Sequence, residues 1–292
     1  MVHQSWGARL GGDATQRARI VAWREGLALA GVLLASVLPS LAGLGATSAV
    51  FALALVLGWA LLTRAPQPDH SHRLLPHVSL RLPLANPAFR RLLLVFMVNG
   101  VASALPATLV LFFIRDRLQL PAYEPLFLFS YFAAGAASMP LWVRAVARWG
   151  LAQAWLAGML LAIVAFVGAA ALGAGDLLPF AAVCVASGLA LGADLALPGA
   201  LLAGVIQRAG HSGRAEGAYF GWWNFATKLN LALAAGVALP LLSAFGYVPG
   251  TRDASALTAL ALAYGLLPCA LKLFAAVLLF RIWLRSPHGE TA

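Results

Sequence analysis

Long apolar runs alternate with short polar connections along most of the chain, a pattern that predicts membrane-spanning helices. A helix needs about 20 residues to cross a bilayer, and eight runs are close to this length or longer. Open strands would leave backbone groups without hydrogen bonds in lipid, and the runs are far longer than barrel strands. The expected spans are 21–43, 46–63, 92–114, 126–143, 151–174, 177–206, 217–245 and 257–284. We therefore expect an all-α integral membrane protein, a bundle of about eight helices.

One connection is much longer than the others and is expected to separate two groups of helices. Residues 65–90 contain several prolines and three histidines, and prolines in such a cluster favour a loop. The prediction is a two-helix part at 1–64, a linker at 65–90 and a six-helix part at 91–292. Asp69 and the nearby histidines have no rigid frame of metal ligands, so we expect no metal site there.

The composition supports a membrane protein and argues against other classes. The chain is 62% apolar and 10% charged, whereas soluble domains carry about 25% charged residues. The net charge of +10 does not form a basic stripe on a soluble domain, and no nucleic-acid-binding motif is present, so we expect no nucleic-acid partner. No P-loop, nucleophile elbow or zinc signature occurs, so we expect no enzyme activity.

The arginines lie mostly on one side of the predicted spans. Fifteen fall at the N-terminus, in 64–91 and at alternate loops, whereas Arg115, Arg117 and Arg252 fall on the other side. Basic loops stay in the cytoplasm. We therefore expect both termini and the linker to be cytoplasmic in a plasma membrane, the bacterial inner membrane.

Lys228 and Asp194 are charged residues inside two successive apolar runs, 217–245 and 177–206. A cation at mid-span costs at least about 2.5 kcal/mol and normally faces a partner or a polar cavity. If the two runs form a helical hairpin, both charges lie at a similar depth, because each residue of helix rises 1.5 Å. We expect an ion pair here, at a midplane site of the kind secondary transporters use for substrate. The alternative is a purely structural, neutralising pair.

Several motifs in the second half of the chain resemble one transporter family. Gly213-Arg-Ala-Glu-Gly-Ala-Tyr-Phe leads to Trp222-Trp-Asn-Phe-Ala-Thr-Lys, and Leu241-Leu-Ser-Ala-Phe-Gly-Tyr closes the same run. The chain resembles the glycoside–pentoside–hexuronide:cation symporters, the melibiose permease-like family of the major facilitator superfamily. That family carries an Arg-x-Glu, a lysine twelve residues after the glutamate and a closing Gly-Tyr, as Glu216, Lys228 and Tyr247 do here.

The resemblance covers essentially the whole chain and implies helices five to twelve of a twelve-helix fold. The acids with which the family binds its coupling cation lie on the first four helices. The resemblance also implies that Arg24, which matches an arginine of the family's fifth helix, lines the sugar cavity; the alternative is an ordinary cytoplasmic anchor. Two acids that usually end the family's tenth helix are absent near Gly204 and Gln207.

Other polar and aromatic residues near Lys228 are candidate substrate ligands. Asn224 shares a helical face with Lys228, and it or Thr227 could bond a sugar hydroxyl or simply join helices. Trp223 could stack on a sugar ring, although aromatic side chains at the membrane interface are commoner. Arg24 and Glu25 are adjacent, do not share a helical face, and are expected to have separate partners.

Two further polar residues lie within apolar runs of the six-helix part. Lys272, in the last span, would be costly without a polar partner, so we expect one. Asn99 is a weaker candidate for the same cavity.

These observations predict a secondary active transporter that moves a sugar or sugar acid with H⁺ or Na⁺ by alternating access. The alternatives are an inactive membrane fragment, a subunit that needs a partner's helices, and a dimer that builds one cavity from two chains. The sequence leaves the substrate, the coupling ion and the oligomeric state open, and predicts no cofactor.

Overall fold

The computed structural model describes residue 8 and residues 13–64 and 79–285, and this part of the chain is an all-α bundle without strands. Eight of its helical segments are long and apolar enough to cross a membrane, as predicted. The helices are α2 (Ala14–Thr63), which supplies two spans, α3 (Leu82–Ala85), α4 (Pro87–Phe112), α5 (Glu124–Trp149), α6 (Leu151–Val167), α7 (Leu177–Arg208), α8 (Glu216–Ala244) and α9 (Ala254–Leu279). Single turns η1 (Phe113–Arg117), η2 (Pro121–Tyr123), η3 (Gly168–Ala171) and η4 (Phe280–Leu284) extend or connect them.

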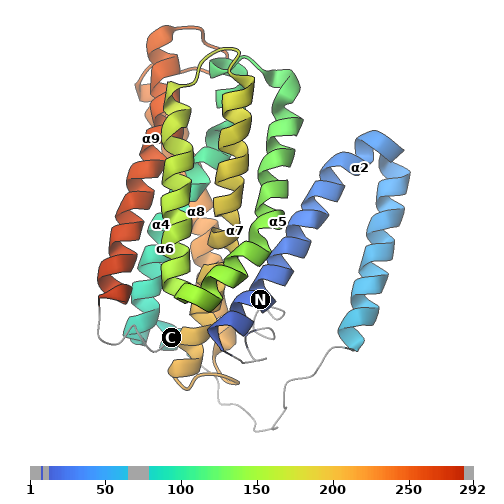
Figure 1. The fold of residues 1–292 in the computed structure, drawn as a ribbon, viewed down its shortest axis with the longest axis vertical. Coiled ribbons are helices and arrows are strands. Elements are labelled where there is room, and N and C mark those ends of the chain that lie inside the picture. The colour runs from blue at the N-terminus through green and yellow to red at the C-terminus, as the bar shows by residue number, and fades with distance from the viewer. Residues whose placement is uncertain (1–7, 9–12, 65–78, 286–292) are drawn as a thin grey trace.

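The helix α2 is bent into a V that stands beside the bundle (Figure 1). The bend follows Pro39 and lies at Gly43, whose φ of 77° breaks the helical backbone. The first arm, Ala14–Pro39, packs against α5 and α7. The second arm, Ala42–Thr63, has no buried residue in its most apolar stretch. The two halves of α2 are therefore attached to the bundle very differently.

The remaining spans do not all pack against their neighbours in the sequence. The helix α4 packs against α8 and α9, whereas α7 packs against α5 and α6, and α6 also contacts α9. The successive helices α7 and α8 therefore do not form a packed hairpin. This arrangement decides which polar side chains can meet inside the bundle.

Two apolar cores lie one above the other along the bundle axis. One is built around Trp155, Phe89 and Tyr219. The other is built around Phe113 and Phe180, with the rings of Phe113 and Tyr264 stacked 4.2 Å apart. Along α4, α7 and α9, polar residues occupy the level between these cores.

Side-chain caps define where two of the spans begin. Asn86 accepts a hydrogen bond from the Ala88 amide and precedes Pro87, so α4 starts at Pro87, earlier than the predicted residue 92. Asp253 likewise caps α9 by accepting from the Ala256 amide.

A carboxylate fastens the loop after α8 to η1, at the end of the bundle opposite the chain termini. Asp116 accepts hydrogen bonds from the Tyr247 hydroxyl and the Gly250 amide. Burial, together with the bond to this carboxylate, raises the pKa of Tyr247 above its usual range, so the hydroxyl remains a donor. The closing Gly-Tyr of the sequence motif therefore has a structural role.

Helices α5 and α7 approach closely because glycines face the contact. A Cβ atom on Gly188 would lie 2.3 Å from the Tyr131 backbone oxygen, and one on Gly192 would lie 2.0 Å from the Ser138 hydroxyl oxygen. Small residues allow this kind of approach between membrane helices. The approach brings Tyr131 on α5 beside Ser187 on α7.

Replacing Gly188 with alanine should weaken this contact. The backbone oxygen of Tyr131 cannot move without moving α5, and overpacking of this kind typically costs about 1–3 kcal/mol. Gly236→Ala is a matched control, because a Cβ there meets nothing within 4 Å. Thermal unfolding in detergent should show a lower midpoint for Gly188→Ala and an unchanged or higher one for Gly236→Ala. Equal midpoints would show that the close approach is not needed.

Candidate functional site

Lys272 lies at the centre of a polar network between the two apolar cores. Its ammonium donates to Asp194 Oδ2 at 2.6 Å, to Asn99 Oδ1 at 2.9 Å and to the Ser103 hydroxyl at 3.0 Å. An ammonium has three N–H donors, so all of its donors are used. The side chain of Lys272 is only 7% exposed, which makes this full set of partners necessary.

Asp194 is satisfied as completely as Lys272. Its Oδ1 accepts from the Asn99 amide nitrogen and from the Trp155 indole nitrogen, each at 3.0 Å, and its Oδ2 also accepts from Ser103 at 3.1 Å. Asn99 and Ser103 each bond to both charges, since each side chain has a donor and an acceptor. The network joins α4, α6, α7 and α9.

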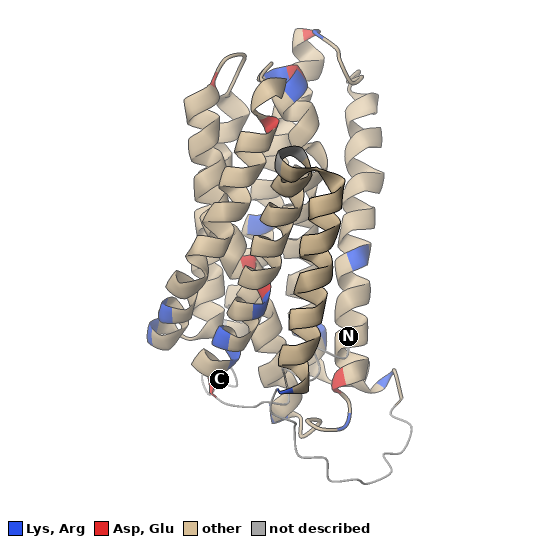
Figure 2. Ribbon diagram, turned by 90° about the vertical axis from the view of Figure 1, so that its right-hand side faces the viewer, with Lys and Arg blue, Asp and Glu red and all other residues tan. Residues whose placement is uncertain are grey.

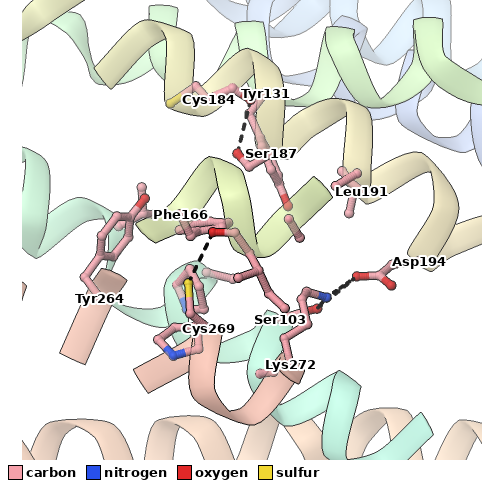
Figure 3. A pocket seen from close by; sticks show the side chains of 18 of the residues that line it. Ser103, Tyr131, Phe166, Cys184, Ser187, Leu191, Asp194, Tyr264, Cys269 and Lys272 are labelled. Carbon is pink, nitrogen blue, oxygen red and sulfur yellow. Dashed lines mark hydrogen bonds and ion pairs between the residues drawn. The ribbon is translucent and has the colours of Figure 1, made fainter. Parts of the chain in front are cut away.

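A cavity of about 140 Å³ opens beside this network (Figure 3). Ser103, Asp194 and Lys272 lie at one part of its wall, and aromatic side chains form much of the rest. The lining residues come from α4, α5, α6, α7 and α9 and include Phe127, Tyr131, Phe132, Ile163, Phe166, Cys184, Ser187, Leu191, Tyr264 and Cys269. The cavity is therefore lined by α4, α5, α6, α7 and α9, and no residue of α2 is among its lining residues.

The chemistry of the cavity suits a small molecule with both polar groups and apolar faces. The charged pair and the Ser103 hydroxyl can donate and accept hydrogen bonds, while the aromatic rings offer apolar surface. Within the residues that the structure describes, no three His, Cys, Asp or Glu side chains could hold a metal ion together. Asp69 and the neighbouring histidines lie outside the described residues.

A family model described as MFS/sugar transport protein matches residues 1–286. The chain belongs to this family. Membership agrees with the eight apolar helices and identifies the protein as a multi-pass membrane transporter of sugars. No curated protein matches the chain.

In this sugar transporter, the structure brings together three polar residues considered in the sequence analysis: Asp194, Lys272 and Asn99. The expectation that Lys272 has a polar partner is confirmed. Trp155 and Ser103 were missed because an isolated tryptophan or serine in an apolar run carries no pattern of its own. Only the packing of α6 and α4 against α7 and α9 reveals them.

The predicted pair of Asp194 with Lys228 is wrong, because Asp194 pairs with Lys272. The prediction paired Asp194 with Lys228 because the two residues were expected at a similar depth in the membrane. Depth does not fix which helices are neighbours, and α8 packs against α4, not against α7. Lys228 is instead exposed on the surface of α8, with Thr227 exposed beside it.

The remaining candidates on α8 bond or pack within the protein and do not line the cavity. Asn224 donates to the Phe220 carbonyl and Thr227 to the Trp223 carbonyl, each on its own helix. The ring of Trp223 is buried and stacks on Phe96, with centroids 3.8 Å apart. This face of Trp223 is therefore occupied by α4.

Arg24 also lies away from the cavity, in the contact between α2 and α7. A small pocket there is lined by Arg24 together with Gly199 and Phe220. Arg24 Nη2 pairs with Glu25 Oε1 at 2.6 Å, so the prediction of separate partners is wrong. The prediction considered only the directions of the Cβ atoms, which differ for adjacent residues. The arginine side chain is long enough to bend back to the neighbouring glutamate.

The sequence motif at the start of α8 fixes a loop and does not form the cavity. Glu216 accepts from the Gly213 amide, and the Tyr219 hydroxyl contacts both Asn86 at 3.1 Å and His211 at 2.8 Å. These bonds tie the α7–α8 connection to the start of α4. The family resemblance of this motif gives no sign of this structural role, which only the packing reveals.

Breaking the charged pair on one side should destabilise the protein strongly. Asp194→Leu leaves a buried ammonium without its counter-charge, and Lys272→Met does the converse; such losses cost about 3–5 kcal/mol. The double variant Asp194→Leu/Lys272→Met removes both charges and should regain most of that loss. Thermal or denaturant unfolding in detergent measures all three.

Glu124→Gln provides the comparison, because it breaks the surface pair of Glu124 with Arg115. An ion pair open to solvent contributes little to stability, so the unfolding midpoint of this variant should be close to that of the unchanged protein. If Asp194→Leu were equally mild, the pair would not be the buried, mutually dependent unit that its distances indicate.

Proposed function

We propose that the cavity beside Lys272 and Asp194 is where this transporter holds its sugar. The observation that carries the proposal is a fully bonded charge pair in the wall of an aromatic-lined cavity, between two apolar cores. Membrane-buried ionisable groups are costly and usually mark substrate or ion pathways. The family description, MFS/sugar transport protein, supports the class of substrate.

Two tyrosines supply further groups for sugar hydroxyls. Tyr131 and Tyr264 both line the cavity, and neither hydroxyl bonds to another group in the described part of the chain. Their rings can lie against the apolar face of a sugar while their hydroxyls bond its edge. Lys272 can donate to a hydroxyl or to the carboxylate of a sugar acid.

We propose further that transport is symport with H⁺ or Na⁺ by alternating access, as the resemblance to the glycoside–pentoside–hexuronide:cation symporters suggests. Asp194 is the carboxylate in the cavity wall, so a cation or proton that reached it would weaken its bond to Lys272 and favour another conformation. The proposed orientation keeps the arginine-rich end, where α2 begins and α9 ends, in the cytoplasm.

The exposed face of α8 is proposed as a second polar surface of the transport path. Lys228 and Thr227 lie at mid-span and are exposed, and a lysine facing lipid there would be costly. Asn224 and Trp223 are on α8, and Arg24 lines a small pocket with Phe220 of α8; none of the three lines the cavity beside Lys272, so we assign their roles in transport to this region.

The alternative is a chain that needs partner helices before it transports. The exposed second arm of α2 and the exposed Lys228 are the observations that favour it. Uptake by the purified chain alone, reconstituted into vesicles, separates the two functions. Uptake only after a second membrane protein is added would support the alternative.

Filling the cavity should stop uptake without unfolding the protein. Ala107 lines the cavity and is itself exposed, so Ala107→Trp can place an indole there with little repacking. Ala137→Trp, at an exposed position of α5 outside the cavity, is the control. Vesicles with a proton or sodium gradient and a panel of labelled glycosides, pentoses and hexuronates would report uptake.

We expect Ala107→Trp to lose at least about tenfold of the uptake rate and Ala137→Trp to keep it. Tyr131→Phe should weaken the apparent affinity by roughly two- to tenfold, the contribution of one ordinary hydrogen bond. Full uptake by Ala107→Trp would place the substrate elsewhere, with the α8 face as the next site to test.

A further inference from the structure

A second depression, which we call the arginine basin, lies at the end of the bundle where α4 begins and α7 and α9 end. Its volume is about 460 Å³. Arg91, Arg208 and His211 supply its basic groups, and Leu82, Val205 and Trp283 are among its apolar walls. None of these residues lines the cavity beside Lys272.

The basin carries positive charge without a compensating acid. No aspartate or glutamate is among its lining residues. Arg91 and Arg208 are both exposed, and the Arg208 guanidinium lies 5.8 Å from the centroid of the Trp283 ring. A ring beneath a guanidinium holds it by a cation–π contact while leaving its N–H groups to other partners. The charge is therefore positioned and open to a ligand.

The level of the basin in the molecule matches the headgroup region of a membrane. It lies where three apolar spans end, and Figure 2 shows many of the blue positions at this end of the bundle. These are arginines, because the two lysines, Lys228 and Lys272, lie within spans. The helix α3 borders the basin with Ala85 and with the half-buried side chain of Leu82. At this depth a phospholipid presents a charged phosphate joined to an apolar chain. Exposed guanidinium groups next to apolar walls match both parts.

We propose that the arginine basin binds the phosphate of an anionic membrane phospholipid. Guanidinium groups match phosphate oxygens with paired N–H donors, so Arg91 and Arg208 hold the phosphate from two helices. The apolar walls contact the glycerol and the first methylene groups. A free phosphate ion shares the charge but would leave these apolar walls without a partner. The lipid thereby joins α4, α7 and η4 at the end of the bundle opposite Asp116.

Lipid binding can be measured on the purified full chain by native mass spectrometry and by thermal unfolding. The probes are dioleoylphosphatidylglycerol, dioleoylphosphatidylcholine and inorganic phosphate, each added to the same detergent. We expect retention of the phosphatidylglycerol and a higher unfolding midpoint with it than with the other two. Arg91→Gln should weaken this binding roughly fivefold, and the Arg91→Gln/Arg208→Gln pair roughly 25-fold, since each surface arginine contributes about one such factor.

Two variants separate this site from general attraction to a basic protein. Arg148→Gln removes an exposed arginine of α5 that is outside the basin and should bind the lipid as the unchanged protein does. Arg91→Lys keeps the charge and should bind more tightly than Arg91→Gln. Equal losses in Arg148→Gln and Arg91→Gln, or equal stabilisation by inorganic phosphate, would overturn the proposal. Because the basin is remote from the sugar cavity, neither result depends on the transport assay.

Discussion

The ammonium of Lys272 needs three hydrogen-bond acceptors in a part of the bundle that is otherwise almost entirely apolar. Leaving it unpaired would be costly, so its partners on α4 and α7 are held at fixed positions. Asp194 neutralises the charge, and Asn99 and Ser103 bond to both members of the pair. Because Trp155 bonds to the same carboxylate, α6 is included in the arrangement. The packing of four helices thus depends on one buried cation.

This arrangement also explains why a cavity persists beside the pair. The two apolar cores pack above and below the polar level, and the network of α4, α7 and α9 side chains lies between them. The side chains of the Lys272 network form their hydrogen bonds with one another, so they need no partner on the aromatic wall of Tyr131, Phe166 and Tyr264. A sugar held there, as we propose, would exchange its hydroxyl groups for the internal bonds of Ser103, which lines the cavity.

The sequence predicted the helices well because each span is read locally from its apolar length. The break between the arms of α2 was expected near residue 43, where Gly43 allows a positive φ. The polar candidates Asp194 and Lys272 were visible because any charge within an apolar run is costly. Their pairing was not predictable, since which helices touch depends on the whole bundle. Lys228 shows the same limit: it lies near the middle of α8, but the side of the helix on which it lies is set by packing against α4.

The central claim is that the pair of Asp194 and Lys272 contacts the sugar and is not merely a structural contact. Uptake by vesicles containing the double variant Asp194→Leu/Lys272→Met tests this claim most directly, because that variant lacks both charges without leaving either one unpaired. The account predicts a folded protein with unfolding behaviour near that of the unchanged chain and no saturable uptake of any sugar that the unchanged chain transports. A folded double variant with normal uptake would contradict it and assign the pair to stability alone.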